Sequence, residues 1–294
     1  MIEALLQFLG WIPMNEVLNP TLMDVLFKYI HLHNDETSLV AFSCVNEILA
    51  QNYVPKEFND FMVNIFKELF KLLQALTKAN EGLSQFEEEY VDKFTQFTSL
   101  FVSHHLRRVE QNANFPIIEF LSLLFRYSFM QTTLEGFLCC LEIWETFLDY
   151  IISQQEGDAP SSLHQRYEHG LSSLGTELIR KIQFQSNGEL LSSLNTESTS
   201  EEDDDSELET YVSACLNVIG KIAQLYPTKI LQVLSSLVNR AQDLLNVHTK
   251  ISNASSPAEK AEVIKTVQDS ELLLRVFSQA ACSFVCIHSC VKSA

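Results

Sequence analysis

The stretch FNDFMVNIFKELFKLLQALTK, residues 58–78, decides the fold class of this chain. Its apolar side chains recur every three or four residues, which is the period of an amphipathic α-helix. The apolar face is predicted to hold Phe61, Ile65, Phe66, Leu69, Phe70, Leu73 and Leu76. The polar face is predicted to hold Asn64, Lys67, Lys71, Gln74 and Lys78.

The helical period continues on both sides of this stretch. Further helices are expected at about 21–33, 35–52, 87–110, 115–130, 132–155, 163–185, 208–225, 228–248 and 258–291. None could bury its apolar face alone, whereas stacked antiparallel pairs could. Residues 1–294 are therefore predicted to form one segment of an all-α, HEAT-type α-solenoid, a superhelical array of helix pairs. A two-domain helical bundle is the alternative architecture.

Composition argues against most other classes. The 294 residues include only 8 Gly and 7 Pro, too few for the turns of a sandwich, a barrel or a wound α/β sheet. No P-loop, nucleophile elbow, HExxH, CxxC pair or Rossmann turn occurs, so we expect a binding protein without catalytic residues, cofactor or metal. Seven cysteines, with Cys139 and Cys140 adjacent, do not resemble a disulfide framework, which predicts a soluble chain in a reducing compartment.

An acidic stretch, STSEEDDDSELE, covers residues 198–209, in a chain of formal net charge -18. We expect an acidic loop between helices at about 190–207. Its candidate electrostatic residues are Glu201, Glu202, Asp203, Asp204, Asp205 and Glu207. Two interpretations remain open, a solvated loop and a contact for a basic surface. The acidic charge argues against binding to nucleic acid or to an anionic membrane, and favours basic proteins as partners.

A cluster of basic side chains, HHLRR, covers residues 104–108. His104, Arg107 and Arg108 are expected near the C-terminus of a helix, where cations favour the exposed carbonyls. No carboxylate or cysteine at ligand spacing supports a metal site at His104 and His105.

Several stretches resemble the exportin branch of the importin-β (karyopherin-β) superfamily. FLGWIP at 8–13 and CVNEIL at 44–49 carry the general resemblance. Residues 43–58, 90–151 and 166–184 are more specific, and are similar to the receptor that exports actin bound to profilin from the nucleus. Because exportins are several times longer, the resemblance implies an interior segment of the N-terminal half, without the first repeats that form the main docking surface for the small GTPase Ran.

The resemblance also implies a function and partners. We expect a segment of a nuclear export receptor that binds actin–profilin and GTP-bound Ran, contacts nucleoporins and shuttles between nucleus and cytoplasm. A HEAT-repeat scaffold outside nuclear transport is the alternative. Helix 58–78 is interpreted as the second helix of its pair, and second helices line the concave face of HEAT solenoids. Lys67, Lys71 and Lys78 are therefore candidate contacts for an acidic cargo, with a solvated helix face as the alternative.

Overall fold

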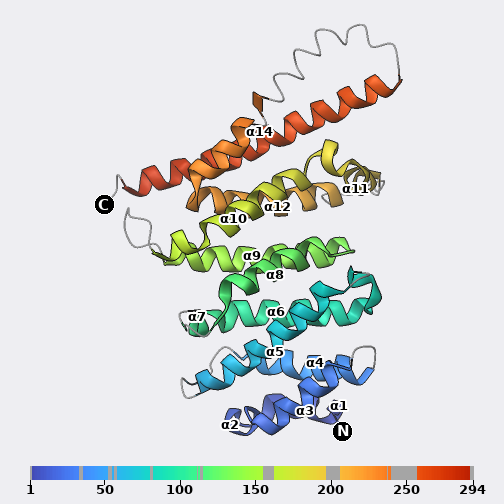
Figure 1. Cartoon of the computed structure of the whole chain (residues 1–294), viewed down its shortest axis with the longest axis vertical. Helices are drawn as coiled ribbons and strands as arrows, with labels where there is room; N and C mark the ends of the chain where they lie inside the picture. Colours follow the sequence, from blue (N-terminus) through green and yellow to red (C-terminus); the bar gives the residue numbers. More distant parts are fainter. Residues whose placement is uncertain are drawn as a thin grey trace. The chain divides into compact units, whose positions relative to one another are not determined.

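The computed structural model describes residues 2–32, 36–51, 55, 58–79, 82–110, 112, 115–154, 162–196, 206–236, 238–239 and 257–291. Over these ranges the chain is helical and contains no strand, which confirms the all-α prediction (Figure 1). The chain divides into two compact units, Met1–Phe147 and Leu148–Ala294, and the boundary falls inside one long helix. Among the described residues, no helix combines the length and apolar character needed to cross a bilayer.

Over its described residues, the first unit consists of helices and short 3₁₀ turns. Its elements are α1 (Ile2–Phe8), η1 (Leu9–Trp11), α2 (Met14–Val17), α3 (Pro20–Ile30), α4 (Glu36–Leu49), α5 (Asn59–Lys78), η3 (Gly82–Gln85), α6 (Glu88–His104), α7 (Leu106–Val109), α8 (Ile117–Phe129) and the start of α9 (Leu134–Ser153). Local signals fix some boundaries. At the start of α3, for example, Pro20 takes the first helical position and Asn19 Oδ1 accepts a hydrogen bond from the Thr21 N–H at 2.9 Å.

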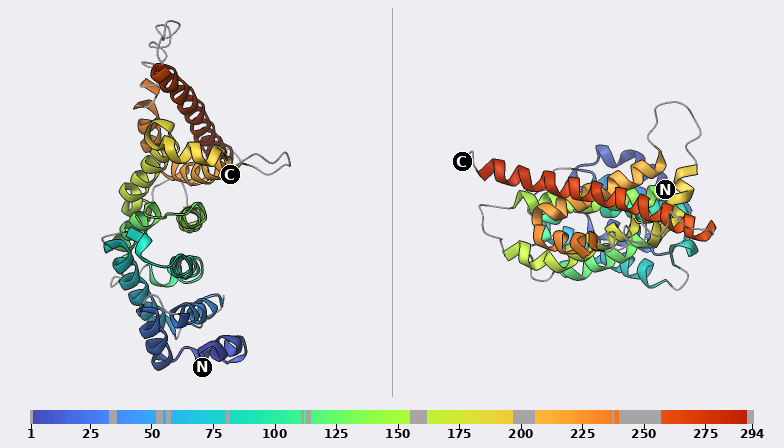
Figure 2. Two further views of the ribbon diagram at one scale, coloured as in Figure 1. Left: turned by 90° about the vertical axis from the view of Figure 1, so that its right-hand side faces the viewer. Right: turned by 90° about the horizontal axis from the view of Figure 1, so that it is seen from above.

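The helices of the first unit lie in two layers. One layer contains α3, α5 and α8, and the other contains α4, α6 and the start of α9 (Figure 2). The contacts agree with this arrangement, since α4 packs on α6, α5 packs on α8 and α3 packs on α4. Successive helices alternate between the layers, so α3 with α4, α5 with α6, and α8 with α9 form consecutive pairs. This is the helix-pair arrangement expected of a HEAT-type fold.

Aromatic side chains fill the space between the two layers. Phe66 of α5 contacts Phe101 of α6, and it also contacts Phe115 and Phe120 at α8. A second cluster joins Phe42 of α4 to aromatic rings of α6, including Tyr90. The Tyr90 hydroxyl also donates a hydrogen bond to the Ile30 carbonyl of α3, at 3.1 Å. These contacts account for the apolar face of the 58–78 stretch, in which Ile65, Phe66, Leu69, Leu73 and Leu76 are buried.

The order of helices corrects one expectation from the sequence. Helix 58–78 is α5, and it is the first helix of its pair, in the layer of α3 and α8. The interpretation as a second helix was wrong. Helix α4 packs on α3 and completes that pair, so α5 begins the next pair, which α6 completes in the other layer. The lysine side chains of α5 therefore belong to the layer of first helices.

The second unit contains α10 (Ser162–Lys181), α11 (Phe184–Thr196), α12 (Glu207–Leu225), a helical stretch at 227–236 and α14 (Pro257–Val291). The main contacts join α12 to α14, α10 to α12, and α11 to α14. Tyr226, at the end of α12, donates a hydrogen bond to the His164 carbonyl of α10 at 2.8 Å. Helix α11 was not expected from the sequence, and it occupies the beginning of the region assigned to a loop at 190–207.

Candidate functional site

The polar face of α5 is present as the sequence predicts. Lys67, Lys71 and Lys78 are all exposed. Lys67 Nζ donates a hydrogen bond to Asn64 Oδ1 at 3.2 Å, and Lys71 Nζ forms an ion pair with Glu68 Oε1 at 2.6 Å. No ion pair to Lys78 occurs within the described ranges. The three ammonium groups therefore differ, because the Glu68 carboxylate partly neutralises the charge of Lys71.

The carboxylate of Glu68, on α5, connects this helix to α3 in the same layer. In addition to Lys71, its Oε2 lies 3.0 Å from His31 Nε2, at the end of α3. Partial burial raises the pKa of Glu68, but the hydrogen bonds from Lys71 and His31 outweigh burial and bring that pKa below its usual range. The ion pairs are partly exposed, so they contribute little to folding and mainly orient Lys71.

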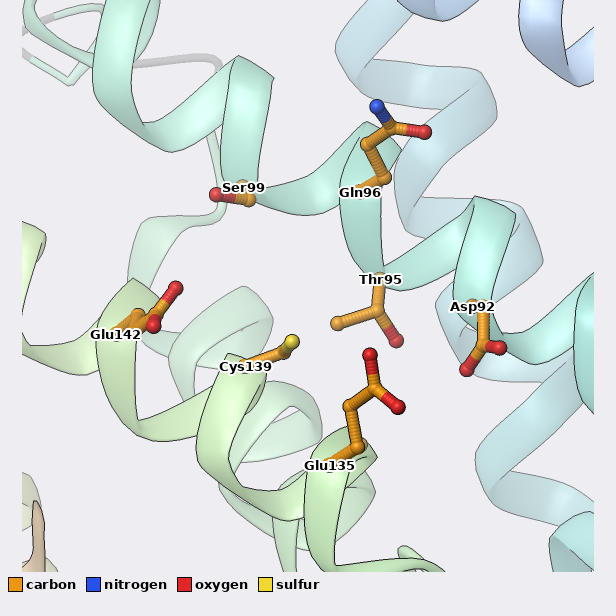
Figure 3. A pocket seen from close by; sticks show the side chains of 8 residues that line it. Asp92, Thr95, Gln96, Ser99, Glu135, Cys139 and Glu142 are labelled. Atoms are coloured by element: carbon orange, nitrogen blue, oxygen red, sulfur yellow. The ribbon is translucent and has the colours of Figure 1, made fainter. Parts of the chain in front are cut away.

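A pocket between α6 and α9 was not anticipated from the sequence. It has a volume of about 270 Å³ and is lined by Asp92, Thr95, Gln96 and Ser99 of α6 and by Glu135, Gly136, Cys139 and Glu142 of α9 (Figure 3). On α6 these residues recur at three and four positions, and the same spacing holds on α9, so each set shares one helix face. This spacing could have been recognised in the sequence. The pocket itself could not, because it forms only where α6 and α9 lie side by side.

The charge in this pocket is of one sign. Burial raises the pKa of Asp92, and the neighbouring carboxylates of Glu88, Glu135 and Glu89 raise it further. Burial also raises the pKa of the Cys139 thiol, with a further contribution from Glu142, Glu135 and Asp92. A thiol held protonated in this way is a poor nucleophile. Across the described residues, no group of three or more His, Cys, Asp or Glu side chains is placed to hold a metal ion.

The basic cluster at 104–108 has a structural role at one of its histidines. His105 separates α6 from α7, is buried, and its Nε2 lies 3.1 Å from the Leu49 carbonyl at the end of α4. Burial lowers the pKa of His105 to about 4. The ring is therefore a neutral donor that satisfies a helix-terminal carbonyl. His104 is partly exposed and ends α6, as the sequence predicts.

The acidic stretch lies largely outside the described residues, which include neither Glu201 and Glu202 nor Asp203, Asp204 and Asp205. Its last part begins α12. Ser206 caps this helix by accepting the Glu209 N–H at 3.2 Å, and Glu207 is exposed in the first turn. Both carboxylate oxygens of Glu209 accept hydrogen bonds from Arg275 of α14. The start of α12 is thereby tied to α14.

Comparison with known proteins gives one consistent result, although no family model matches the chain. Exportin-6 of Dictyostelium discoideum is 37% identical over 291 residues, which is 96% of this chain and 27% of that protein. Exportin-6 of Mus musculus is 36% identical over 279 residues, covering 84% of this chain and 24% of that protein. Exportin-1 of Schizosaccharomyces pombe is 24% identical over 163 residues, covering 53% of this chain and 15% of that protein.

The chain thus spans about a quarter of the length of the exportin-6 relatives that it matches. The similarity covers both units, since the alignment with the Dictyostelium protein includes nearly the whole chain. By sequence, therefore, this chain belongs with the exportin-6 proteins, over a segment that makes up about a quarter of their length.

Proposed function

We propose that this chain is a segment of a nuclear export receptor, which binds protein cargo and GTP-bound Ran and moves between nucleus and cytoplasm. The observation that carries the proposal is the similarity to exportin-6 over 96% of the chain. Stacked helix pairs suit this work, because they expose long helix faces to large partners. Cargo and Ran would be coupled by a reciprocal free energy, typically ~1–3 kcal/mol, through their shared array.

The cargo that we propose is actin bound to profilin, with Lys67, Lys71 and Lys78 as contacts for an acidic surface. Their exposure on one face of α5 supports this role. Since α5 is the first helix of its pair, the proposed contact is on the layer of α3, α5 and α8. Lys78 and Lys67 are the stronger candidates, because Lys71 already pairs with Glu68. Nucleoporin contacts are part of the same proposal and have no assigned residues.

The proposed activity is binding, without catalysis. The side chains of the α6–α9 pocket support this view, since burial and the neighbouring carboxylates raise the pKa of the Cys139 thiol and keep it protonated. A scaffold outside nuclear transport remains the second candidate. It differs in one measurable property, because a scaffold would hold its partners with the same affinity whether or not Ran is present.

The test uses a protein of the full length of the exportin-6 relatives, with this segment in place. Actin–profilin is captured on the receptor with Ran locked in its GTP form, with Ran bound to GDP, and without Ran. Export predicts that capture rises about 5–150-fold with the GTP form, the range of typical coupling energies. Equal capture in the three conditions would favour the scaffold, and absence of actin–profilin in all three would reject this cargo.

A further inference from the structure

Helix α14 has apolar side chains on two opposite sides. One side packs on α12 and α11 (Figure 1). The buried apolar residues of that side are Leu272, Leu273, Val276 and Ala280. On the other side Ile264, Val267 and Leu274 are 58%, 54% and 70% exposed. A helix that is apolar on two sides normally packs on both, so this second face is a candidate interaction surface.

The exposed residues follow a heptad repeat. Seven positions of α14 are spaced alternately by four and three residues, so they lie along one side of the helix. We call them the outer stripe of α14. They are Lys260, Ile264, Val267, Glu271, Leu274, Ser278 and Ala281, and all are exposed. Single exposed apolar residues are ordinary on a protein surface, whereas a continuous row at this spacing is typical of a seam between two helices.

The charges of the outer stripe indicate which helix fits. Lys260 lies four residues before Ile264, and Glu271 lies four residues after Val267. Consider two copies of α14 that run antiparallel, with Ile264 of each opposite Val267 of the other. Lys260 of each copy then faces Glu271 of the other copy. The stripe is therefore complementary to itself, in charge as well as in apolar positions.

The same charges specify the register. A shift of one heptad in one direction places Glu271 opposite Val267, and a shift in the other direction places Lys260 opposite Ile264. Either shift buries a charge against an apolar side chain, which is unfavourable. Only the register with reciprocal Lys260–Glu271 contacts avoids this cost within one heptad of shift.

The neighbouring Arg275 leaves Glu271 available for this contact. Arg275 lies four residues after Glu271, but its guanidinium donates hydrogen bonds to both carboxylate oxygens of Glu209, on α12. The hydrogen bonds with Glu209 contribute most to the raised pKa of Arg275, and Glu271 contributes least. The arginine is thus held mainly by α12, and Glu271 remains exposed beside it.

We propose that α14 is a surface for self-association, at which two copies of this chain pair antiparallel through their outer stripes, with Lys260 of each copy on Glu271 of the other. The contact uses the same residues on both copies, so it closes at a dimer. It does not depend on the proposed export function, whose candidate cargo residues lie on α5. Because the apolar seam is short, we expect a weak dimer with a Kd on the order of 10 µM.

Sedimentation equilibrium of the whole 294-residue chain tests the proposal, at concentrations on both sides of this Kd and about 0.1 M salt. We expect a monomer–dimer equilibrium. Ile264→Gln removes an apolar contact at the centre of the seam and should raise the Kd about ten-fold. A chain that stays monomeric throughout would overturn the proposal. Species larger than a dimer that grow with concentration would also overturn it, because they indicate a head-to-tail contact with another surface, such as the exposed Trp11.

Charge reversal tests the register. Lys260→Glu and Glu271→Lys each place like charges opposite one another at two points of the dimer, so each should raise the Kd about ten-fold. In an equimolar mixture of these two variants, opposite charges face one another again at both points, and association should return to that of the unmodified chain. A mixture that associates no better than either variant alone would overturn the antiparallel pairing.

The matched controls are Glu262→Lys and Lys265→Glu. Both reverse an exposed charge on α14 outside the outer stripe, and each should change the Kd less than about two-fold. Effects equal to those of the stripe variants would show that net charge alone governs association, which contradicts the proposal. Circular dichroism of each variant verifies that the helices are retained.

Discussion

His105 shows how one buried ring can join two helix pairs. The ring lies at the break between α6 and α7, with its Nε2 on the Leu49 carbonyl of α4, while Nδ1 has no hydrogen-bond partner in the described structure. A carbonyl at a helix end has no partner inside its own helix, so burial is tolerated only when another group donates to it. A neutral imidazole meets this need, and a charged one would have to be buried without compensation.

This arrangement predicts an acid sensitivity. Burial lowers the folded-state pKa of His105 to about 4, below the ~6.5 of an exposed histidine. Between these values the unfolded chain binds a proton that the folded chain does not, so stability falls as the pH falls from about 6.5 towards 4. The loss at pH 5 relative to pH 7 is at most about 2 kcal/mol. Urea unfolding at the two pH values measures it.

The matched variants for this experiment are His105→Gln and His104→Gln. Glutamine at 105 keeps a donor for the Leu49 carbonyl but does not titrate, so the difference between pH 7 and pH 5 should shrink by most of the His105 contribution. The neighbouring His104 is partly exposed, and its replacement should leave the difference unchanged. An identical pH dependence in both variants would show that other groups cause the acid sensitivity.

At the scale of elements, α14 holds the beginnings of two other helices. The Asp269 carboxylate accepts the N–H groups of Phe184 and Gln185 at the start of α11, and Arg275 pairs with Glu209 near the start of α12. The first four N–H groups of a helix have no partner within it, and a carboxylate is favoured at that end. The acidic stretch therefore follows one helix, α11, and runs into another, α12, and α14 holds the beginnings of both.

Removal of the Asp269 carboxylate should loosen α11 more than the rest of the unit. Asp269→Ala deletes a cap from another helix, and loss of a cap typically costs about 0.5–2 kcal/mol. Amide hydrogen exchange should accelerate across 184–196, while α12 keeps its protection. Glu262→Ala, at an exposed site on the same helix, is the control and should change neither. Uniform acceleration through the second unit would show that Asp269 supports the global fold instead.

The same elements show what sequence patterns could and could not predict. The period of three to four residues placed α5 within one residue of its observed ends, because an amphipathic face is a local property. Helix α11 was missed because Asp269, distant in sequence, stabilises its start, and α6 was expected to run through His105 because the Leu49 carbonyl is equally remote. The order of pairs and the α6–α9 pocket depend on which helices become neighbours, which periodicity does not encode.

At the scale of the whole molecule, the charge of -18 is unevenly placed. In the first unit the acidic charge gathers on α4, α6 and α9, whereas α5 presents three exposed lysines. Long-range attraction depends on the sign of the nearest face, so a partner of either charge can find a favourable approach. Long-range charges act mainly on the association rate and its dependence on salt.

The cargo proposal leads to a prediction for the lysines of α5 in a protein of full receptor length. Lys67→Gln/Lys71→Gln/Lys78→Gln removes three charges from one exposed face and leaves the apolar face of α5 intact. Exposed interfacial charges contribute about 0.2–1 kcal/mol each, so binding of actin–profilin should weaken about ten-fold at low salt, mainly through slower association. The control, Lys229→Gln/Lys260→Gln/Lys265→Gln, removes the same charge from exposed positions outside the layer of α3, α5 and α8. The association and dissociation rates of actin–profilin are measured on immobilised receptor at two salt concentrations. If α5 contacts the cargo, the α5 variant should lose both affinity and salt dependence, and the control variant should lose neither. Equal behaviour of the two variants would identify the polar face of α5 as a solvated surface, with the cargo bound elsewhere on the receptor.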